Sequence, residues 1–253
     1  MIIVLDVGNS RFKWSTLSNA VLSSVHSQEH RRQDKAQAIV TALESSQTPR
    51  RIVVASVLGD DFKAAFTRLA RARLGAEPEF VVPERFAYGV LVAYTDPSLF
   101  GADRFAALVA ARQDLGQACI LVDCGTAVTI DALTSDGEHL GGLILPGPDL
   151  MRRSLIEHTA RLDDGDDRHD YSLFGRSTSH AVKVGALRGL AGAIDRIVED
   201  MSISLSERDQ DEIQRIMTGG AGAVLLPYLT ANYRLEPHLV LQGLAIIAQG
   251  NRA

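Results

Sequence analysis

The sequence predicts an α/β protein built from two related lobes. An unbroken apolar run ends in an aspartate at Asp6 and again at Asp123, and glycine follows each aspartate after one intervening residue. The two aspartates lie 117 positions apart (123 − 6). Through the rest of the chain, segments with helical periodicity alternate with short apolar runs typical of strands. A chain of 253 residues can form two small domains, which we place at residues 1–116 and 117–253.

Composition limits the class of protein. The net charge of −5 argues against broad affinity for nucleic acids or anionic membranes. Hydrophobic residues make up 46% of the chain and charged residues 23%, which is typical of a soluble globular enzyme. No apolar run reaches the roughly 20 residues of a membrane span, and the N-terminus lacks the basic start and cleavage site of a signal peptide. We therefore expect a cytoplasmic protein without nucleic-acid or membrane partners.

The first lobe opens with a predicted hairpin whose turn follows Asp6. The next strand places Phe12 and Trp14 on one face and puts Lys13 on the other, polar face. Lys13 would then lie near Asp6, where it could neutralise a phosphate, although a solvated surface lysine explains the spacing equally well. The remaining pattern predicts strands over residues 21–27, 52–56, 80–82 and 90–93, and helices over 34–46 and 60–74.

The middle of the chain combines irregular backbone with a charged helix start. Pro97 and Gly101 mark the irregular segment, and the spacing predicts a helix over 102–115 that ends at a glycine. Asp103 falls in the first helical turn, where the helix dipole favours an ionised carboxylate. A carboxylate that merely stabilises the helix is the alternative.

The second lobe opens with a hairpin over residues 120–129. A glycine such as Gly125 lets the backbone approach an anion, Thr126 offers a hydroxyl and a backbone N–H, and Asp123 could hold a cation or orient water. Because aspartate and glycine are ordinary turn residues, the alternative is two unrelated strand–turn–strand units. Cys119 and Cys124 are interpreted as small core residues.

The rest of the second lobe completes the α/β pattern. We expect a strand over 138–145, a helix over 151–157 and a long helix from a Ser177 or Thr178 cap to about Met201. A strand over 213–217 leads into a glycine-rich turn at 218–222 and a helix to about residue 229. This strand–turn–helix pattern is typical of nucleotide-binding sites, because backbone N–H groups are free at the helix start. Residues 239–249 form the predicted closing helix.

Taken together, these segments resemble the type III pantothenate kinases, within the acetate-and-sugar-kinase/heat-shock ATPase/actin superfamily. The resemblance spans nearly the whole chain, and the Gly-Ala-Asp-Arg segment narrows it to this family. Ser10 stands where the family usually has threonine, and Phe100 where it usually has leucine. The matching segments are residues 6–10 with Lys13 and residues 123–127 for phosphate, residues 101–104 with Tyr94 and Pro97 for pantothenate, residues 141–142, 146–147 and 175–178 at the substrate end, and residues 218–220 for adenosine.

The resemblance implies two ribonuclease-H-like lobes with a nucleotide cleft between them, as in actin-like ATPases, and a homodimer. It implies phosphorylation of pantothenate by ATP to 4'-phosphopantothenate, the first step of coenzyme A biosynthesis, with Asp103 as general base. Mg²⁺ would come with ATP, and Asp123 would hold a monovalent cation, K⁺ or NH₄⁺. The implied ATP-binding residues are Asp6, Val7, Gly8, Asn9, Ser10, Arg11, Phe12, Lys13 and Thr126, and the implied substrate-binding residues are Tyr94, Gly101, Ala102, Asp103, Arg104 and Thr178.

Three alternatives remain open from the sequence. Arg104 could pair with the anionic substrate or form a structural salt bridge. The chain could be another small-molecule kinase, or a phosphatase, of the same superfamily. It could also be a non-catalytic accessory regulator of transcription, although the net charge of −5 and the absence of a recognition-helix pattern favour an enzyme.

Overall fold

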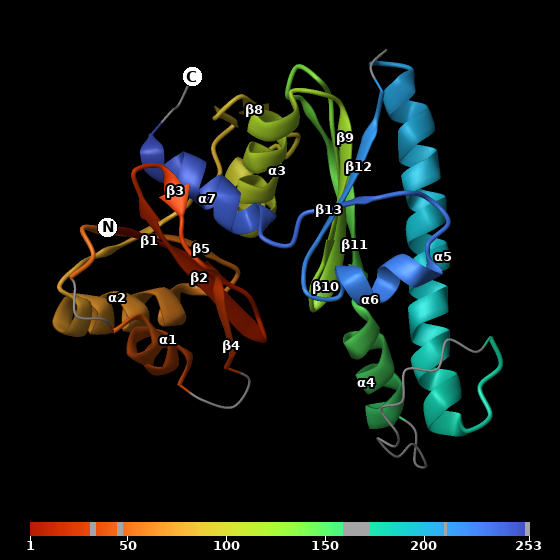
Figure 1. The fold of residues 1–253 in the computed structure, drawn as a ribbon, viewed down its shortest axis with the longest axis horizontal. Helices are drawn as coiled ribbons and strands as arrows, with labels where there is room; N and C mark the ends of the chain where they lie inside the picture. Colours follow the sequence, from red (N-terminus) through yellow and green to blue (C-terminus); the bar gives the residue numbers. More distant parts are fainter. Residues whose placement is uncertain (31–33, 45–47, 159–172, 210–211, 251–253) are drawn as a thin grey trace. The chain divides into compact units, whose positions relative to one another are not determined.

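The computed structural model describes residues 1–30, 34–44, 48–158, 173–209 and 212–250. The chain divides into two compact units, each with its own sheet and helices (Figure 1). The first unit consists of Met1–Gly116, Ser135–Gly141 and His238–Ala253, and the second consists of Gln117–Thr134 and Gly142–Pro237.

The first unit contains a six-stranded sheet in the order β3-β2-β1-β5-β6, with β4 also paired to β2. Strand β1 pairs antiparallel with β2 and parallel with β5, and β5 pairs parallel with β6. The elements, in chain order, are β1 (Ile2–Val7), β2 (Arg11–Ser18), β3 (Val21–Leu22), β4 (His26–Glu29), α1 (Lys35–Leu43), β5 (Arg51–Ser56), α2 (Asp60–Leu74), β6 (Pro78–Phe80), the small ribbon of β7 (Phe86–Ala87) and β8 (Val90–Leu91), the 3-10 helix η1 (Pro97–Leu99), α3 (Ala102–Leu115) and α7 (Leu239–Gln249).

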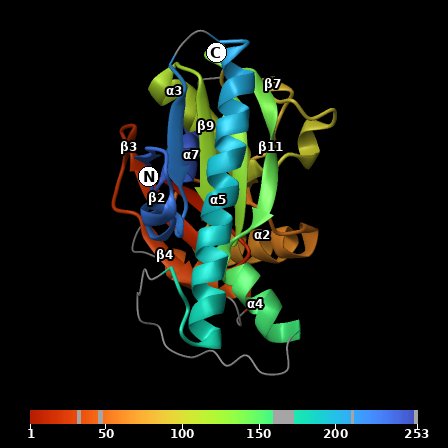
Figure 2. The same cartoon turned by 90° about the vertical axis from the view of Figure 1, so that its right-hand side faces the viewer.

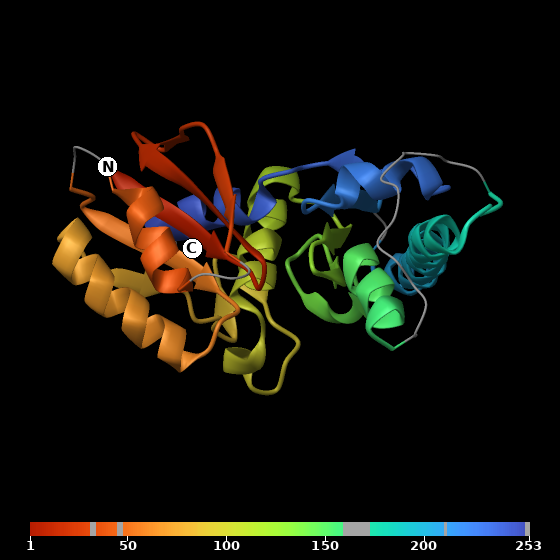
Figure 3. The same cartoon turned by 90° about the horizontal axis from the view of Figure 1, so that it is seen from below.

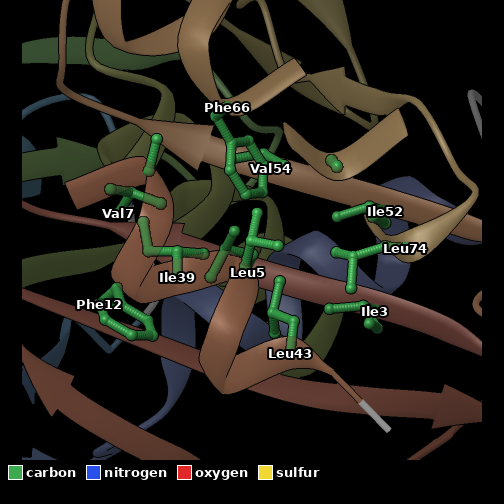
Figure 4. Packing of buried hydrophobic residues seen from close by; sticks show 13 residues of the cluster. Ile3, Leu5, Val7, Phe12, Ile39, Leu43, Ile52, Val54, Phe66 and Leu74 are labelled. Carbon is green, nitrogen blue, oxygen red and sulfur yellow. The ribbon is translucent and has the colours of Figure 1, made fainter. Parts of the chain in front are cut away.

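Alternation along the strands builds the core of the first unit. Successive side chains of a strand point to opposite faces, so Ile3, Leu5 and Val7 share one face of β1. Figure 4 shows these residues packed against apolar side chains of α1 and α2. Helices α1 and α2 lie on one face of the sheet and α7 lies on the other (Figures 1 and 3). Strand β1 is therefore covered on both faces, which matches its nearly continuous apolar sequence.

The C-terminal helix α7 packs against α3 and the first sheet. A Cβ at Gly243 would overlap the carbonyl group of Ala106, so the two helices cross with their backbones in contact. The end of α7 is held by Arg51, whose Nη1 donates to Ala248 O at 2.6 Å. The observed units therefore differ from the lobes expected at residues 1–116 and 117–253, because α7 buries its apolar side chains in the first unit.

The second unit contains a five-stranded sheet in the order β11-β10-β9-β12-β13. Strand β9 pairs antiparallel with β10 and parallel with β12, and β12 pairs parallel with β13. Helix α5 runs along one face of this sheet (Figure 2). The elements are β9 (Cys119–Cys124), β10 (Ala127–Leu133), β11 (His139–Pro146), α4 (Pro148–His158), α5 (Thr178–Ser206), β12 (Gln214–Thr218), α6 (Gly222–Leu225), the 3-10 helix η2 (Leu226–Tyr228) and β13 (Arg234–Leu235).

The two sheets share one topological plan. In each, the first strand pairs antiparallel with the next strand of the chain and parallel with a later strand, which pairs parallel with another. The expectation of two related units is therefore confirmed, and the alternative of two unrelated strand–turn–strand units is wrong.

Most predicted elements form, with three corrections. The strand expected over residues 80–82 lies earlier, as β6 at Pro78–Phe80. The predicted strand over 21–27 is two short strands, β3 and β4, each paired to β2. The helix expected after the glycine-rich turn is only one turn, α6, followed by η2. Pro227 explains the shortening, because proline has no backbone N–H to continue the helix. Among the described residues, no helix has the length and apolar character needed to cross a bilayer.

Candidate active site

The first hairpin presents Asp6 at the end of the buried strand β1. Asp6 lies opposite Lys13 of β2 and beside Ala55 of β5. The turn that follows is closed by the N–H of Gly8, which donates to Arg11 O at 3.0 Å. The register of the two strands therefore brings the Asp6 carboxylate and the Lys13 ammonium to the same end of the hairpin, where both side chains are partly exposed.

Three of the expected ATP-binding residues in this hairpin have other contacts. The side chains of Val7 and Phe12 are fully buried in the core, so only their backbone could reach a nucleotide. The guanidinium of Arg11 pairs with Glu29 of β4 at 2.7 Å, with both side chains about half exposed. An exposed pair of this kind contributes about 0–1 kcal/mol, so it would yield readily to a phosphate.

Two residues that the sequence interpretation missed hold the same turn. His30 is buried, its Nε2 lies 3.0 Å from Gly8 O, and its backbone N–H donates to Ser10 O at 3.1 Å. Lys35 of α1 donates from Nζ to Asn9 O at 3.4 Å. Neither residue belongs to the Asp-x-Gly pattern, so a motif search within the hairpin could not find them.

Helix α3 begins with the segment that carries Asp103. Gly101 is the N-cap, and a Cβ at this position would lie 2.6 Å from Oδ1 of Asp103. The same oxygen accepts the N–H of Arg104 at 2.8 Å. The glycine therefore leaves room for the carboxylate to bend back over the helix start, where the helix dipole favours a negative charge.

Arg104 is buried among aromatic rings next to Asp103. Its guanidinium lies 4.6 Å from the centre of the Phe100 ring, and Nη1 donates to the Tyr94 hydroxyl at 3.1 Å. Phe100 in turn packs edge-on against Tyr94, with ring centres 5.0 Å apart. Arg104 thus holds Tyr94 and Phe100 at the start of α3 through its hydrogen bond to one ring and its position over the other.

The second hairpin is surrounded by close glycine backbones. The N–H of Gly125 donates to Ala127 O at 3.0 Å, and the N–H of Gly147 donates to Thr126 O at 3.0 Å. A Cβ at Gly147 would lie 2.5 Å from Gly125 O. Gly219, with a φ of +87°, approaches from the end of β12, and a Cβ there would overlap Oδ1 of Asp123. Segments from three parts of the chain thus meet at Asp123 and Thr126.

The structure places the two cysteines and Thr178, the last residue that the resemblance assigns to the substrate. Cys119 and Cys124 are fully buried, and burial raises the pKa of each thiol to about 12, which confirms them as core residues. Thr178 is the exposed first residue of α5, whose N-cap is Ser177. In the described ranges, no three His, Cys, Asp or Glu side chains gather in a group that could hold a metal ion by themselves.

Comparisons with known proteins agree on one family. The model of the family described as type III pantothenate kinase matches residues 2–200. A curated type III pantothenate kinase from Nitrosococcus oceani is 35% identical over 254 aligned positions, covering 98% of this chain and 94% of the relative.

Two solved structures share the fold. A Campylobacter jejuni protein described as a Baf family transcriptional activator has a TM-score of 0.62 and 20% identity, with 98% of both chains covered. A Sinorhizobium meliloti protein described as a 2-dehydro-3-deoxygalactonokinase has a TM-score of 0.54 and 14% identity, covering 99% of this chain and 100% of that one. These similarities confirm the predicted actin-like, two-lobe fold class.

The contact between Gly219 and Asp123 generates a prediction. Gly219→Ala combines an unfavourable positive φ with a Cβ that overlaps the carboxylate, so we expect loss of both stability and activity. The substitution should lower the free energy of unfolding by about 2–4 kcal/mol, so the melting temperature should fall by roughly 5–15 °C. The neighbouring Gly220→Ala is the control, because nothing lies within 4 Å of its Cβ position. Equal melting temperatures for the two variants would contradict the close approach.

Proposed function

The chain belongs to the type III pantothenate kinase family, and we propose that it transfers the γ-phosphate of ATP to the primary hydroxyl of pantothenate. The product is 4'-phosphopantothenate, so the reaction is the first step of coenzyme A biosynthesis and belongs to the cytoplasm. The observation that carries the proposal is the combination, in one chain, of two strand–Asp-x-Gly–strand hairpins with a carboxylate at a glycine-capped helix start.

Phosphoryl transfer through a loose transition state needs mainly alignment and neutralisation of charge. The turns after β1 and β9 supply backbone N–H groups and the hydroxyls of Ser10 and Thr126, while Lys13 supplies a positive charge opposite Asp6. Mg²⁺ bound with ATP supplies further positive charge at the phosphates. In this assignment Val7 and Phe12 contribute only backbone groups, because their side chains are buried.

Asp103 is the general base in this proposal. One of its oxygens accepts the N–H of Arg104, which orients the carboxylate at the start of α3. The carboxylate accepts the proton of the pantothenate hydroxyl as the bond to phosphorus forms. Tyr94, held by Arg104 and Phe100, lines the substrate side together with Gly101 and Ala102.

The overall activity can be tested with a coupled assay of ADP release. The purified protein should consume ATP only when both pantothenate and Mg²⁺ are present. A panel of sugars and acetate serves as the control, because other kinases of this fold act on such substrates. Turnover that ignores pantothenate but responds to another acceptor would refute the substrate assignment.

If Asp103 is the general base, substituting it should slow turnover without unfolding the protein. Asp103→Asn keeps nearly the same shape but cannot accept a proton, so turnover at saturating pantothenate should fall about 10²–10⁴-fold. The lost helix-dipole interaction is worth at most about 1 kcal/mol at such a site, so the thermal melt should change little. Asp114→Asn, near the other end of α3, is the matched control and should keep full activity. A folded Asp103→Asn enzyme with near wild-type turnover would remove Asp103 from the mechanism.

We also propose that Asp123 would help to hold a monovalent cation, whose positive charge would offset the repulsion between this carboxylate and ATP. Without a cation, a carboxylate at the end of β9 would repel the nucleotide. The rate should therefore rise when K⁺ or NH₄⁺ replaces Na⁺ at equal ionic strength, and Asp123→Asn should abolish this difference between salts. Equal wild-type rates in all three salts would count against the cation.

The assembly that we propose is a homodimer formed by the second unit. The apolar side chains of Leu143 and Ile144 on β11 are 47% and 62% exposed, and β11 is the last strand of its sheet. On α5, Gly185 and Gly189 have open space at their Cβ positions, which would let a second helix approach closely.

Light scattering at working concentration tests this assembly. The wild-type protein should scatter as two chains, and Gly189→Arg should shift it toward one chain. Val21→Arg, at a 68% exposed position of the first unit, adds the same side chain as a control and should leave two chains. A fully active wild-type monomer would disprove the dimer.

A further inference from the structure

His30 is a buried titratable residue that the mechanism above does not use. It follows β4, its side chain is 1% exposed, and its imidazole stacks on the Phe12 ring with centres 5.9 Å apart. Burial lowers the pKa of His30 below its ordinary value. The imidazole lies against the turn that follows Asp6, because its Nε2 is 3.0 Å from Gly8 O.

The hydrogen bonds of His30 define which ring nitrogen carries the proton. Nε2 lies 3.0 Å from Gly8 O, and a carbonyl oxygen only accepts, so Nε2 must be the N–H. Nδ1 is then an acceptor, and it is buried without a hydrogen-bond partner among the described residues. Leaving a buried polar atom unsatisfied is costly, whereas a phenylalanine would stack on Phe12 without that cost. The donor to Gly8 O is the contact that a purely apolar ring could not supply.

The same residue orients two peptide planes of the turn. In a trans peptide the C=O and the following N–H point in opposite directions. Because His30 Nε2 holds Gly8 O and the His30 N–H holds Ser10 O at 3.1 Å, the N–H groups of Asn9 and Arg11 are turned away from His30. Lys35 holds the intervening carbonyl of Asn9 at 3.4 Å. Three consecutive carbonyls, which would repel an anion, are thereby directed to protein donors.

We propose that His30 is a positioning residue for ATP: it fixes the turn so that backbone N–H groups, rather than carbonyls, face the phosphates. The inference rests on the proposed function only in assigning this turn to the nucleotide. It predicts that nucleotide affinity depends on the Nε2–H donor itself, beyond the packing of the ring.

Two substitutions separate the donor from the ring. His30→Phe keeps a stacked ring but removes the donor, while His30→Gln loses the ring but can place an amide N–H near Gly8 O. Both variants retain the backbone N–H that holds Ser10 O. Ile39→Val, in the same core, is the control for general destabilisation, because it removes one buried methylene group.

The measurement is the equilibrium dissociation constant for ATP with Mg²⁺, together with the KM for pantothenate and a thermal melt. In His30→Phe the ATP dissociation constant should rise about tenfold, the factor expected when a buried carbonyl loses its donor, with the KM for pantothenate unchanged. His30→Gln should restore the constant to within about threefold of wild type, and Ile39→Val should not change it.

Several results would overturn the inference. These are wild-type ATP affinity in His30→Phe, a defect in His30→Gln as large as in His30→Phe, or an equal loss of affinity in Ile39→Val. A wild-type protein that binds ATP but does not phosphorylate pantothenate would refute the proposed function and leave the His30 inference to be judged by the binding constants. A wild-type protein that binds no ATP would refute both.

Discussion

Each of the two hairpins presents an aspartate at the end of a strand, and neighbouring strands on both sides fix the register of that strand. Asp6 lies between Lys13 and Ala55, and Asp123 lies between Thr129 and Thr218. Because side chains alternate along a strand, a slip of one residue would turn the carboxylate into the apolar core and an apolar side chain toward the turn. Burial of a carboxylate there is costly. The register that packs the apolar side chains of β1 and β9 is therefore also the register that keeps the two carboxylates out of the core.

The two hairpins reach a defined turn by different means. In the first, side chains and backbone from outside the hairpin hold its carbonyls: His30 contacts Gly8 and Ser10, and Lys35 contacts Asn9. In the second, glycine backbones from distant segments pack directly on the turn, at Gly147 and Gly219. Repeated topology therefore does not require repeated contacts, and substitutions at equivalent positions of the two hairpins should have different consequences.

The start of α3 uses aromatic packing to position a polar segment. Gly101 leaves room for Asp103 to bend over the helix start, and Arg104 is locked against Phe100 and Tyr94. The Phe100 ring gives the guanidinium a face to contact, a cation–π interaction that an aliphatic side chain could not make.

The sequence by itself determined the local features: two strand–Asp-x-Gly–strand hairpins, a glycine-capped helix carrying Asp103, and the alternation of helices and strands. These are written in short runs of residues, because strand and helix periodicity and turn chemistry act over only a few positions. Only the tertiary structure decided that α7 joins the first unit, that Gly147 and Gly219 close on the Asp123 hairpin, and that His30 holds the turn after Asp6. Each of those contacts joins residues distant in the sequence, and no local pattern specifies which distant backbone will fill the space beside a given turn.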